Sequence, residues 1–246
     1  MKLLNMSCMK NRQSAANNLS IEQYQVLLTG KFGDGCLHKN KGLHANFIYT
    51  TNSINKEIVE FKVKLLGNLA SKAPIRKYLN MGYKKNTIYS GGSITSPIIT
   101  AFFNEDWKYS LENMNELGLA LWFYDDGSLH KRGLFYNLNT QKFSKEDNEY
   151  IAEFLKRKWN IIAIPTIERK KDGREFWYLR IRKFEGAFEI SKILNKYYLD
   201  CYKYKIISSE TIQKWSKLQE ELKSTGKDIT KIHPRTLSSM MDKMSL

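Results

Sequence analysis

Residues 34–43 read DGCLHKNKGL, and residues 126–134 read DGSLHKRGL. Both stretches follow the pattern Asp-Gly-x-Leu-His-Lys, then a short polar tip, then Gly-Leu. A second similarity follows each stretch in the same order, with TNSINKE at 51–57 and TQKFSKE at 140–146. Because ordered matches at a nearly constant offset are hard to obtain by chance, the sequence predicts an internal duplication.

A predicted helix precedes each Asp-Gly pair. Ser20 and Gln23 have the spacing of a capping box at the start of the first helix, and residues 113–116 repeat that spacing before the second. Gly35 and Gly127 are expected to end the two helices as C′ residues. Each half therefore begins as a helix and continues into a β-hairpin.

The rest of each half predicts a helix, a second hairpin and a last helix. We expect hairpins at 37–51, 75–89, 129–140 and 163–182, and helices at 55–70, 97–104, 144–159 and 184–197. The predicted fold class is α+β, with two pseudo-symmetric αββαββα halves built on antiparallel sheets and a further helix at 208–222. The predicted domains are a flexible N-terminus at 1–19, a first half at 20–107, a second half at 108–207, and a C-terminal helix and tail at 208–246.

The charge balance favours a polyanionic partner. The chain has 40 Lys and Arg residues against 25 Asp and Glu residues, which gives a formal net charge of +15. Nucleic acid is the usual partner of such a protein, because neutralised phosphates release condensed counterions. A basic composition without any partner is the alternative.

Cysteine content and hydropathy exclude other classes. The three cysteines form no Cys-x-x-Cys pair, which argues against a structural zinc site and against a disulfide-built secreted protein. No apolar run approaches the length of a membrane span, and residues 1–18 lack the apolar block of a signal peptide. We therefore expect an intracellular, non-secreted protein without a membrane partner.

The alternation of side chains in the predicted strands indicates one wet face on each sheet. In the strand 176–182, Trp177, Leu179 and Ile181 point to one face, and tyrosine and arginine residues point to the other. Residues 75–79 alternate less cleanly, with Ile75, Lys77 and Leu79 on the expected core face. An antiparallel sheet with one wet, basic face can lie in a major groove as a DNA-binding saddle, whereas an ordinary solvated face is the alternative. The candidate DNA-binding residues are Arg76, Tyr78, Lys84, Lys85, Lys131, Arg132, Lys170, Lys171, Tyr178, Arg180 and Arg182.

Acidic residues stand at the predicted C-termini of both repeat helices. Asp34, Asp125 and Asp126 meet the negative end of the helix dipole there, which disfavours each carboxylate by roughly 0.3–1 kcal/mol. A divalent cation would neutralise these acids and also bind phosphate oxygens. The alternative is a solvated Asp-Gly turn. A single turn of this kind is common, but two at equivalent positions of a repeat are not.

Small residues suggest that the two helices pack closely and bring Asp34 and Asp126 to one centre. The candidates for close approach are Thr29, Gly30, Gly33, Gly118 and Ala120. Paired acids with shared or adjacent metals can activate water on either DNA strand.

Two stretches resemble a known sequence motif. LLTGKFGDG at 27–35 and LALWFYDDG at 119–127 resemble the two LAGLIDADG motifs of homing endonucleases, and LNTQKF at 138–143 is typical of the single-chain, intron-encoded branch. The resemblance covers residues 21–207. It implies a monomeric, Mg²⁺-dependent endonuclease that cuts a long asymmetric site in double-stranded DNA and leaves 3′ overhangs.

The resemblance also assigns roles to individual residues. Asp34 and Asp126, each directly before a terminal glycine, correspond to the catalytic metal ligands. The family also has a basic residue late in each half, near the metals. In the second half this residue corresponds to Lys205, with Lys203 as the alternate, and in the first half it corresponds to Lys108. The usual Lys-x-Pro context is missing in the first half, which puts Lys108 in doubt.

Two related functions stay open on the same motifs. Some relatives assist the splicing of intron RNA, and others bind DNA without cutting it. The presence of both Asp34 and Asp126 favours cleavage, because a binding protein does not need the pair.

Overall fold

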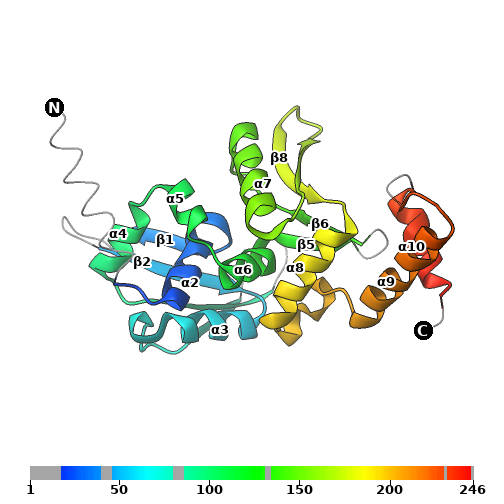
Figure 1. Cartoon of the computed structure of the whole chain (residues 1–246). Helices are drawn as coiled ribbons and strands as arrows, with labels where there is room; N and C mark the ends of the chain where they lie inside the picture. Colours follow the sequence, from blue (N-terminus) through cyan, green and yellow to red (C-terminus); the bar gives the residue numbers. More distant parts are fainter. Residues whose placement is uncertain (1–17, 40–45, 80–85, 131–133, 230–231, 245–246) are drawn as a thin grey trace. The chain divides into compact units, whose positions relative to one another are not determined.

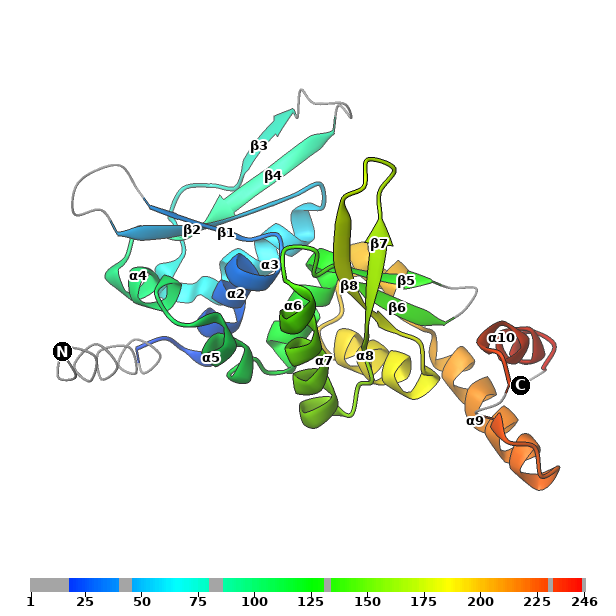
Figure 2. The same cartoon turned by 90° about the horizontal axis from the view of Figure 1, so that it is seen from above.

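Each Asp-Gly repeat opens a four-stranded antiparallel sheet (Figures 1 and 2). The computed structural model describes residues 18–39, 46–79, 86–130, 134–229 and 232–244. The first sheet has the order β1-β2-β4-β3 and contains β1 (Cys36–Lys39), β2 (Phe47–Ser53), β3 (Arg76–Leu79) and β4 (Thr87–Gly92). The second has the order β5-β6-β8-β7 and contains β5 (Gly127–His130), β6 (Phe135–Leu138), β7 (Ile164–Arg169) and β8 (Glu175–Ile181). The equal strand orders confirm the α+β fold and the duplication.

Helices separate the hairpins as predicted in both halves. The first half has α2 (Ile21–Phe32), α3 (Lys56–Leu66), η1 (Gly67–Leu69) and α4 (Pro97–Phe103). The second half has α6 (Glu116–Asp126), α7 (Lys145–Trp159), α8 (Phe184–Lys196) and η2 (Asp200–Lys205). The remaining helices are α5 (Trp107–Glu112), α9 (Ser209–Ser224) and α10 (Pro234–Asp242), of which α5 and α10 were not predicted.

Contacts divide the chain into two compact units that differ from the sequence halves. One unit runs to Asp125 and includes Leu199–Cys201, and the other contains Asp126–Tyr198 and the chain from Tyr202 onward. The second repeat helix, α6, therefore packs with the first unit up to its penultimate residue. The two sequence halves reflect the internal repeat, whereas the two units reflect which residues lie in contact with one another.

The first sheet buries one face against α2, α3 and α4. Tyr49 and Thr51 on β2 are buried on this face, and a Cβ at Gly91 on β4 would lie only 2.7 Å from the Val63 side chain. A glycine is therefore needed where α3 crosses β4. The alternate residues of β2, such as Thr50 and Asn52, lie on the open face.

The prediction that Lys77 and Leu79 of β3 face the core is wrong. Lys77 and Leu79 are exposed, with Leu79 at 53%. β3 is an edge strand that pairs with β4 alone, so it lies beyond the helices that cover the centre of the sheet.

The second sheet buries one face against α7 and α8. Leu179 and Ile181 on β8 are fully buried, as the alternation predicted, together with Tyr136 and Leu138 on β6. Figure 2 shows the helices of each unit gathered on one side of its strands. Each unit thus keeps its other sheet face open.

Local capping signals were partly correct. Ser20 and Gln23 form the predicted capping box of α2. The second box is wrong, because Asn113 ends α5 and Asn115 caps α6 by accepting bonds from the N–H groups of Leu117 and Gly118.

The predicted C′ role is wrong for Gly35, whereas the second repeat helix does end at its Asp-Gly pair. α2 already ends at Phe32, with Gly33 as C-cap, so Gly35 is not the C′ residue. A Cβ at Gly35 would lie 2.8 Å from the backbone nitrogen of Gly30, which makes close backbone approach the reason for this glycine. Gly127 begins β5 directly after α6.

The C-terminal region contains more order than predicted. α10 follows α9 and packs against it, so part of the predicted tail forms a helix. Among the helices of the described ranges, none has both the length and the hydrophobicity to cross a bilayer.

A buried polar cluster fastens the segment after α4 to α2. Lys31 Nζ donates to the Glu105 carbonyl at 2.8 Å and to Ser110 Oγ at 2.7 Å, and the Tyr24 hydroxyl donates to Glu105 Oε2 at 3.0 Å. Burial lowers the pKa of Lys31 to about 8, although the charges of Glu105 and Asp106 act in the opposite direction. Burial likewise raises the pKa of the Glu105 carboxyl.

The variant Lys31→Met tests this cluster through its pH dependence. Since the folded state releases the Lys31 proton near pH 8 and the unfolded state near pH 10.5, the free energy of unfolding of the wild type should rise relative to Lys31→Met across that window. Urea denaturation at pH 7.5 and pH 10 measures the difference. The control Lys64→Met removes an exposed lysine of α3 and should show the same difference from wild type at both pH values. A constant difference for Lys31→Met as well would contradict a burial penalty on this charge.

Candidate active site

The two repeat helices run side by side in the same direction within the first unit. Near their starts, Gln25 of α2 accepts a bond from the Asn115 N–H at 2.9 Å and donates to the Asn113 carbonyl at 3.1 Å. Farther along, the rings of Phe32 and Trp122 lie 5.1 Å apart. The predicted packing of the two helices is therefore present.

Only some of the predicted small residues serve this packing. A Cβ at Gly118 would lie 2.2 Å from Gln25 Oε1, and one at Gly33 would lie 2.4 Å from Asp125 Oδ2. Gly30 instead faces Leu37, and the Thr29 hydroxyl bonds the Tyr49 hydroxyl at 2.7 Å. The expectation that Thr29 and Gly30 lie between the helices is therefore wrong, because both face the first sheet.

Asp125 is bound within the first unit. Its two carboxylate oxygens accept bonds from Lys62 Nζ at 2.6 and 2.8 Å, and Oδ2 also accepts from the Asp34 N–H at 3.0 Å. The side chains of Lys62 and Asp125 are 1% and 4% exposed. Because its oxygens are occupied by protein groups, Asp125 is poorly suited to bind a metal. Sequence reasoning missed Lys62, which carries no motif signal.

The two predicted metal ligands lie at the ends of these helices. Asp34 is exposed and follows the C-cap of α2, whereas Asp126 is half-buried and is the last residue of α6. The Asp126 carbonyl accepts from the Asn139 N–H at 3.1 Å, which fixes its backbone to the second sheet. Asp34 and Asp126 belong to different units, so the meeting of their carboxylates at one centre stays a prediction.

The donor set fits a cation that is completed by substrate. Over the part of the chain that the structure describes, no group of three or more His, Cys, Asp or Glu side chains could hold a metal. Mg²⁺ is commonly held by one or two carboxylates together with water and substrate phosphates. Asp34 and Asp126 supply carboxylates of this kind.

The predicted basic residues lie in different surroundings. Lys205, on η2, is buried, with Nζ 4.8 Å from the centre of the Tyr202 ring, and its carbonyl accepts a bond from the buried Tyr136 hydroxyl. The alternate Lys203 is exposed on the same turn, and Lys108 is exposed on α5. Of the two candidates on η2, Lys205 therefore has the more restricted side chain.

The start of η2 is fixed by a contact that sequence reasoning missed. The Glu57 carboxylate accepts from the N–H groups of Asp200 and Cys201 at 3.0 and 2.9 Å. These hydrogen bonds keep the pKa of Glu57 below its ordinary value.

The open face of the second sheet carries an ordered group of polar and aromatic side chains. Arg180 Nε donates to Asn137 Oδ1 at 3.1 Å, its guanidinium also bonds the Tyr178 hydroxyl, and it lies 5.6 Å from the centre of the Phe135 ring. His130 stacks on Phe135 at 4.4 Å. Sequence reasoning found Tyr178 and Arg180 but missed His130, Phe135 and Asn137, although their alternation along β5 and β6 was available.

The open face of the first sheet combines small hydroxyl and amide side chains with Arg76. Arg76 and Tyr78 are exposed on β3, as expected of surface residues. The register aligns Arg76 with Ser90 and Asn52 across three strands. A hollow on this face is lined in part by His38, Thr50, Arg76 and Ser90.

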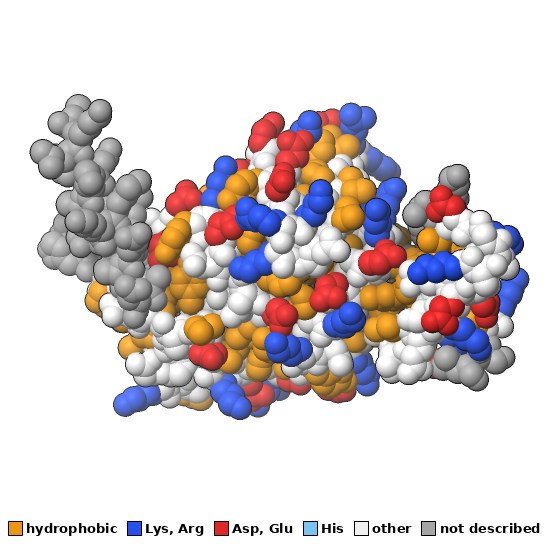
Figure 3. Space-filling view, in the orientation of Figure 1, with side chains coloured by type: hydrophobic (Ala, Val, Ile, Leu, Met, Phe, Trp, Pro, Cys, Tyr) orange, Lys and Arg blue, Asp and Glu red, His pale blue; other side chains and the backbone are white. Residues whose placement is uncertain are grey.

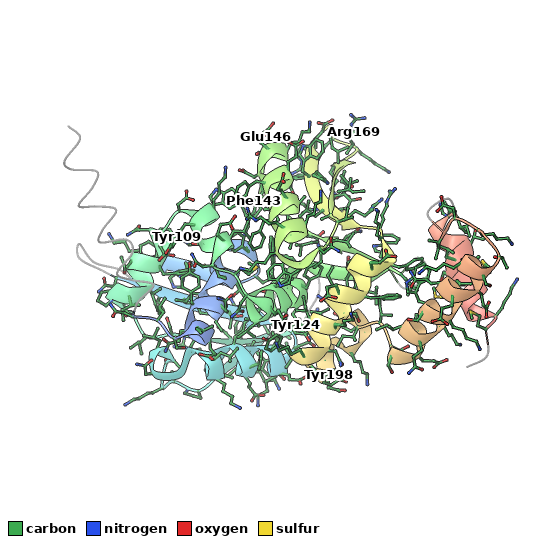
Figure 4. All side chains as sticks on the ribbon, viewed as in Figure 1. Tyr109, Tyr124, Phe143, Glu146, Arg169 and Tyr198 are labelled. Atoms are coloured by element: carbon green, nitrogen blue, oxygen red, sulfur yellow. The ribbon has the colours of Figure 1, made fainter. Side chains whose placement is uncertain are left out.

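The β7–β8 tip is less basic than its sequence suggests. Lysine and arginine side chains gather over this hairpin, with acidic side chains among them, and Arg169 lies at the tip (Figures 3 and 4). Salt bridges join Arg169 to Glu175, Lys170 to Glu168, and Arg174 to Asp172. Of the other candidates, Lys171 and Arg182 are exposed, and Lys84, Lys85, Lys131 and Arg132 lie outside the described residues.

Comparisons with known proteins identify related sequences. A model of the LAGLIDADG DNA endonuclease family matches residues 26–188. A probable intron-encoded DNA endonuclease 3 of Mycosarcoma maydis is 45% identical over 96 residues, which cover 39% of this chain and 66% of the relative. The cytochrome b mRNA maturase bI2 of Saccharomyces cerevisiae (strain ATCC 204508 / S288c) is 27% identical over 223 residues, which cover 82% of this chain and 51% of the relative. The chain thus spans less than two thirds of the length of either curated relative.

A solved structure shares the fold. The homing endonuclease I-WcaI, solved bound to its DNA recognition sequence, aligns with a TM-score of 0.60 and 20% identity over 77% of this chain and 87% of that chain. The two duplicated halves therefore form a known architecture.

Proposed function

Because this chain belongs to the LAGLIDADG DNA endonuclease family, we propose that it is a site-specific homing endonuclease that makes a metal-dependent double-strand cut in DNA. The observation that carries the proposal is the parallel packing of α2 and α6, each of which leads to an acidic residue before a glycine. We further propose a long asymmetric site, a monomeric enzyme and an intracellular location.

Asp34 and Asp126 would hold Mg²⁺ or a similar divalent cation. When bound, the cation supplies Lewis-acid stabilisation of phosphate charge and activation of water. Each Asp also stands at the negative end of a helix, where a cation is favoured. Lys205 and Lys108 would offset the charge that develops on the phosphate, as positioned cations do in phosphoryl chemistry.

The two open sheet faces would read different parts of the DNA site. The first presents hydroxyl and amide groups such as Asn52 and Ser90 beside Arg76, and the second presents Tyr178 and Arg180 among aromatic rings. Because the chemistry of the two faces differs, we expect two unequal half-sites rather than a palindrome.

Splicing of intron RNA is a second candidate function. The match to a yeast mRNA maturase covers 82% of this chain, which is more than the endonuclease relative covers. A maturase would use its basic surfaces for RNA and would not depend on the metal-binding acids.

The variant Asp126→Asn separates the two functions. Loss of one metal ligand should reduce Mg²⁺-dependent cutting by roughly 100-fold or more while DNA binding persists, because the stabilisation of reacting charge is removed. Cleavage is measured on sites selected from a random DNA pool, with Asp172→Asn at an exposed hairpin tip as control. Splicing of the host intron by Asp126→Asn, without cutting by the wild type, would support the maturase instead.

A pair of substitutions distinguishes base reading from phosphate binding. Arg180 is held in orientation by Asn137 and Tyr178, so Arg180→Gln should cost about 1–3 kcal/mol at one base position and leave the salt dependence of binding unchanged. Lys171→Gln should weaken binding to all sequences and reduce the slope of log affinity against log salt by about 1. Binding titrations at several salt concentrations measure both effects. A salt-independent affinity of the wild type would contradict a phosphate-binding surface.

A further inference from the structure

The ion pair between Lys62 and Asp125 is buried at a position where stability alone does not explain it. Both side chains are almost inaccessible, and both carboxylate oxygens lie within 2.8 Å of Lys62 Nζ. Removing two charges from water is expensive, and apolar residues of similar volume often stabilise a protein as well or better. Stability alone therefore does not account for the burial of Lys62 and Asp125.

The Asp125 carboxylate reaches the backbone of Asp34. Its Oδ2 accepts the Asp34 N–H at 3.0 Å and so joins the end of α6 to the residue that follows the end of α2. Gly33 makes room for this contact, because a Cβ there would lie 2.4 Å from the same oxygen. The carboxylate thus has a fixed place between Lys62 on one side and Asp34 on the other.

The duplication does not repeat this arrangement. The position equivalent to Asp125 in the first motif is Gly33, and the position equivalent to Lys62 in the second half is the buried Ile151. The backbone of Asp126 is held differently, by the bond from Asn139 to its carbonyl. The ion pair therefore joins residues of the two halves without an equivalent pair at Ile151 and Gly33, and it lies beside the predicted metal ligand Asp34.

We propose that Lys62 and Asp125 are positioning residues, which orient the Asp34 carboxylate toward the metal by holding the Asp34 backbone. Lys62 fixes the Asp125 carboxylate, and Asp125 fixes the Asp34 N–H. This role rests on the proposed endonuclease function, in which Asp34 binds the cation. Neither Lys62 nor Asp125 needs to touch DNA or metal.

Two double variants isolate the hydrogen bond from the charge pair. Lys62→Met with Asp125→Asn removes both charges but keeps a side-chain oxygen that can accept the Asp34 N–H. Lys62→Met with Asp125→Leu removes both charges and the acceptor, at nearly the same volume. Thermal unfolding of each variant shows whether the fold is kept, and Lys64→Met is the matched control on the exposed side of α3.

The first measurement does not depend on activity. Hydrogen exchange at the Asp34 amide, followed by NMR, should be slow in the wild type, in Lys64→Met and in the Asn double variant, and at least about tenfold faster in the Leu double variant. Mn²⁺ affinity in the presence of DNA, measured by electron paramagnetic resonance, should be lower in the Leu double variant than in the other three proteins.

The second measurement is cleavage at saturating DNA. A misplaced ligand costs on the order of 100-fold in rate, so the Leu double variant should lose roughly 10- to 100-fold in kcat with little change in KM, whereas the Asn double variant should stay near the wild type. Equal exchange, Mn²⁺ affinity and kcat in the two double variants would overturn the positioning role. A wild type that cuts no DNA would instead overturn the proposed endonuclease function, while the exchange result would still decide whether Asp125 holds Asp34.

Discussion

The close approach of α2 and α6 is the constraint on which the rest of the candidate site depends. A Cβ at Gly118 near the start or at Gly33 near the end would displace the Gln25 or Asp125 side chain, and the ring contact between Phe32 and Trp122 lies between them. With the helices held at both ends, their last residues have little freedom. The position of the Asp34 backbone is then determined by helix packing in the core rather than by the turn between α2 and β1.

This dependence explains why the fold was easier to predict than the site. The hairpins are short-range patterns, and the capping box at Ser20 needs only four residues. The pairing of β2 with β4 and of β6 with β8 joins hairpins across an intervening helix, and the sequence did not predict it. The contact between Lys62 and Asp125 joins residues 63 positions apart and has no local signature. A cation was expected to neutralise Asp125 together with Asp34 and Asp126, whereas the Asp125 oxygens accept bonds from Lys62 and from the Asp34 N–H.

The other errors share a cause, because tertiary contacts override local pattern. The short helix α5 is fastened through Ser110 to Lys31 of α2, and nothing in its six residues predicts that contact. Leu79 has the alternation of a core residue, but its strand lies at the edge of the sheet. Total charge does not locate a basic surface, since three salt bridges offset most of the basic residues at the β7–β8 tip.

Divergence between the copies bears on the kind of DNA that this fold suits. A duplicated scaffold with identical halves would favour a site with twofold symmetry, because equal surfaces read equal sequences. Here one open sheet face carries hydroxyl and amide groups beside Arg76, and the other carries an arginine held by an asparagine among aromatic rings. The acids differ as well, since Asp34 is held by a carboxylate from the other motif and Asp126 by its own sheet. A single chain lets each half change independently, so the two halves keep one strand order while their side chains differ. The proposed endonuclease would accordingly treat its two DNA strands differently.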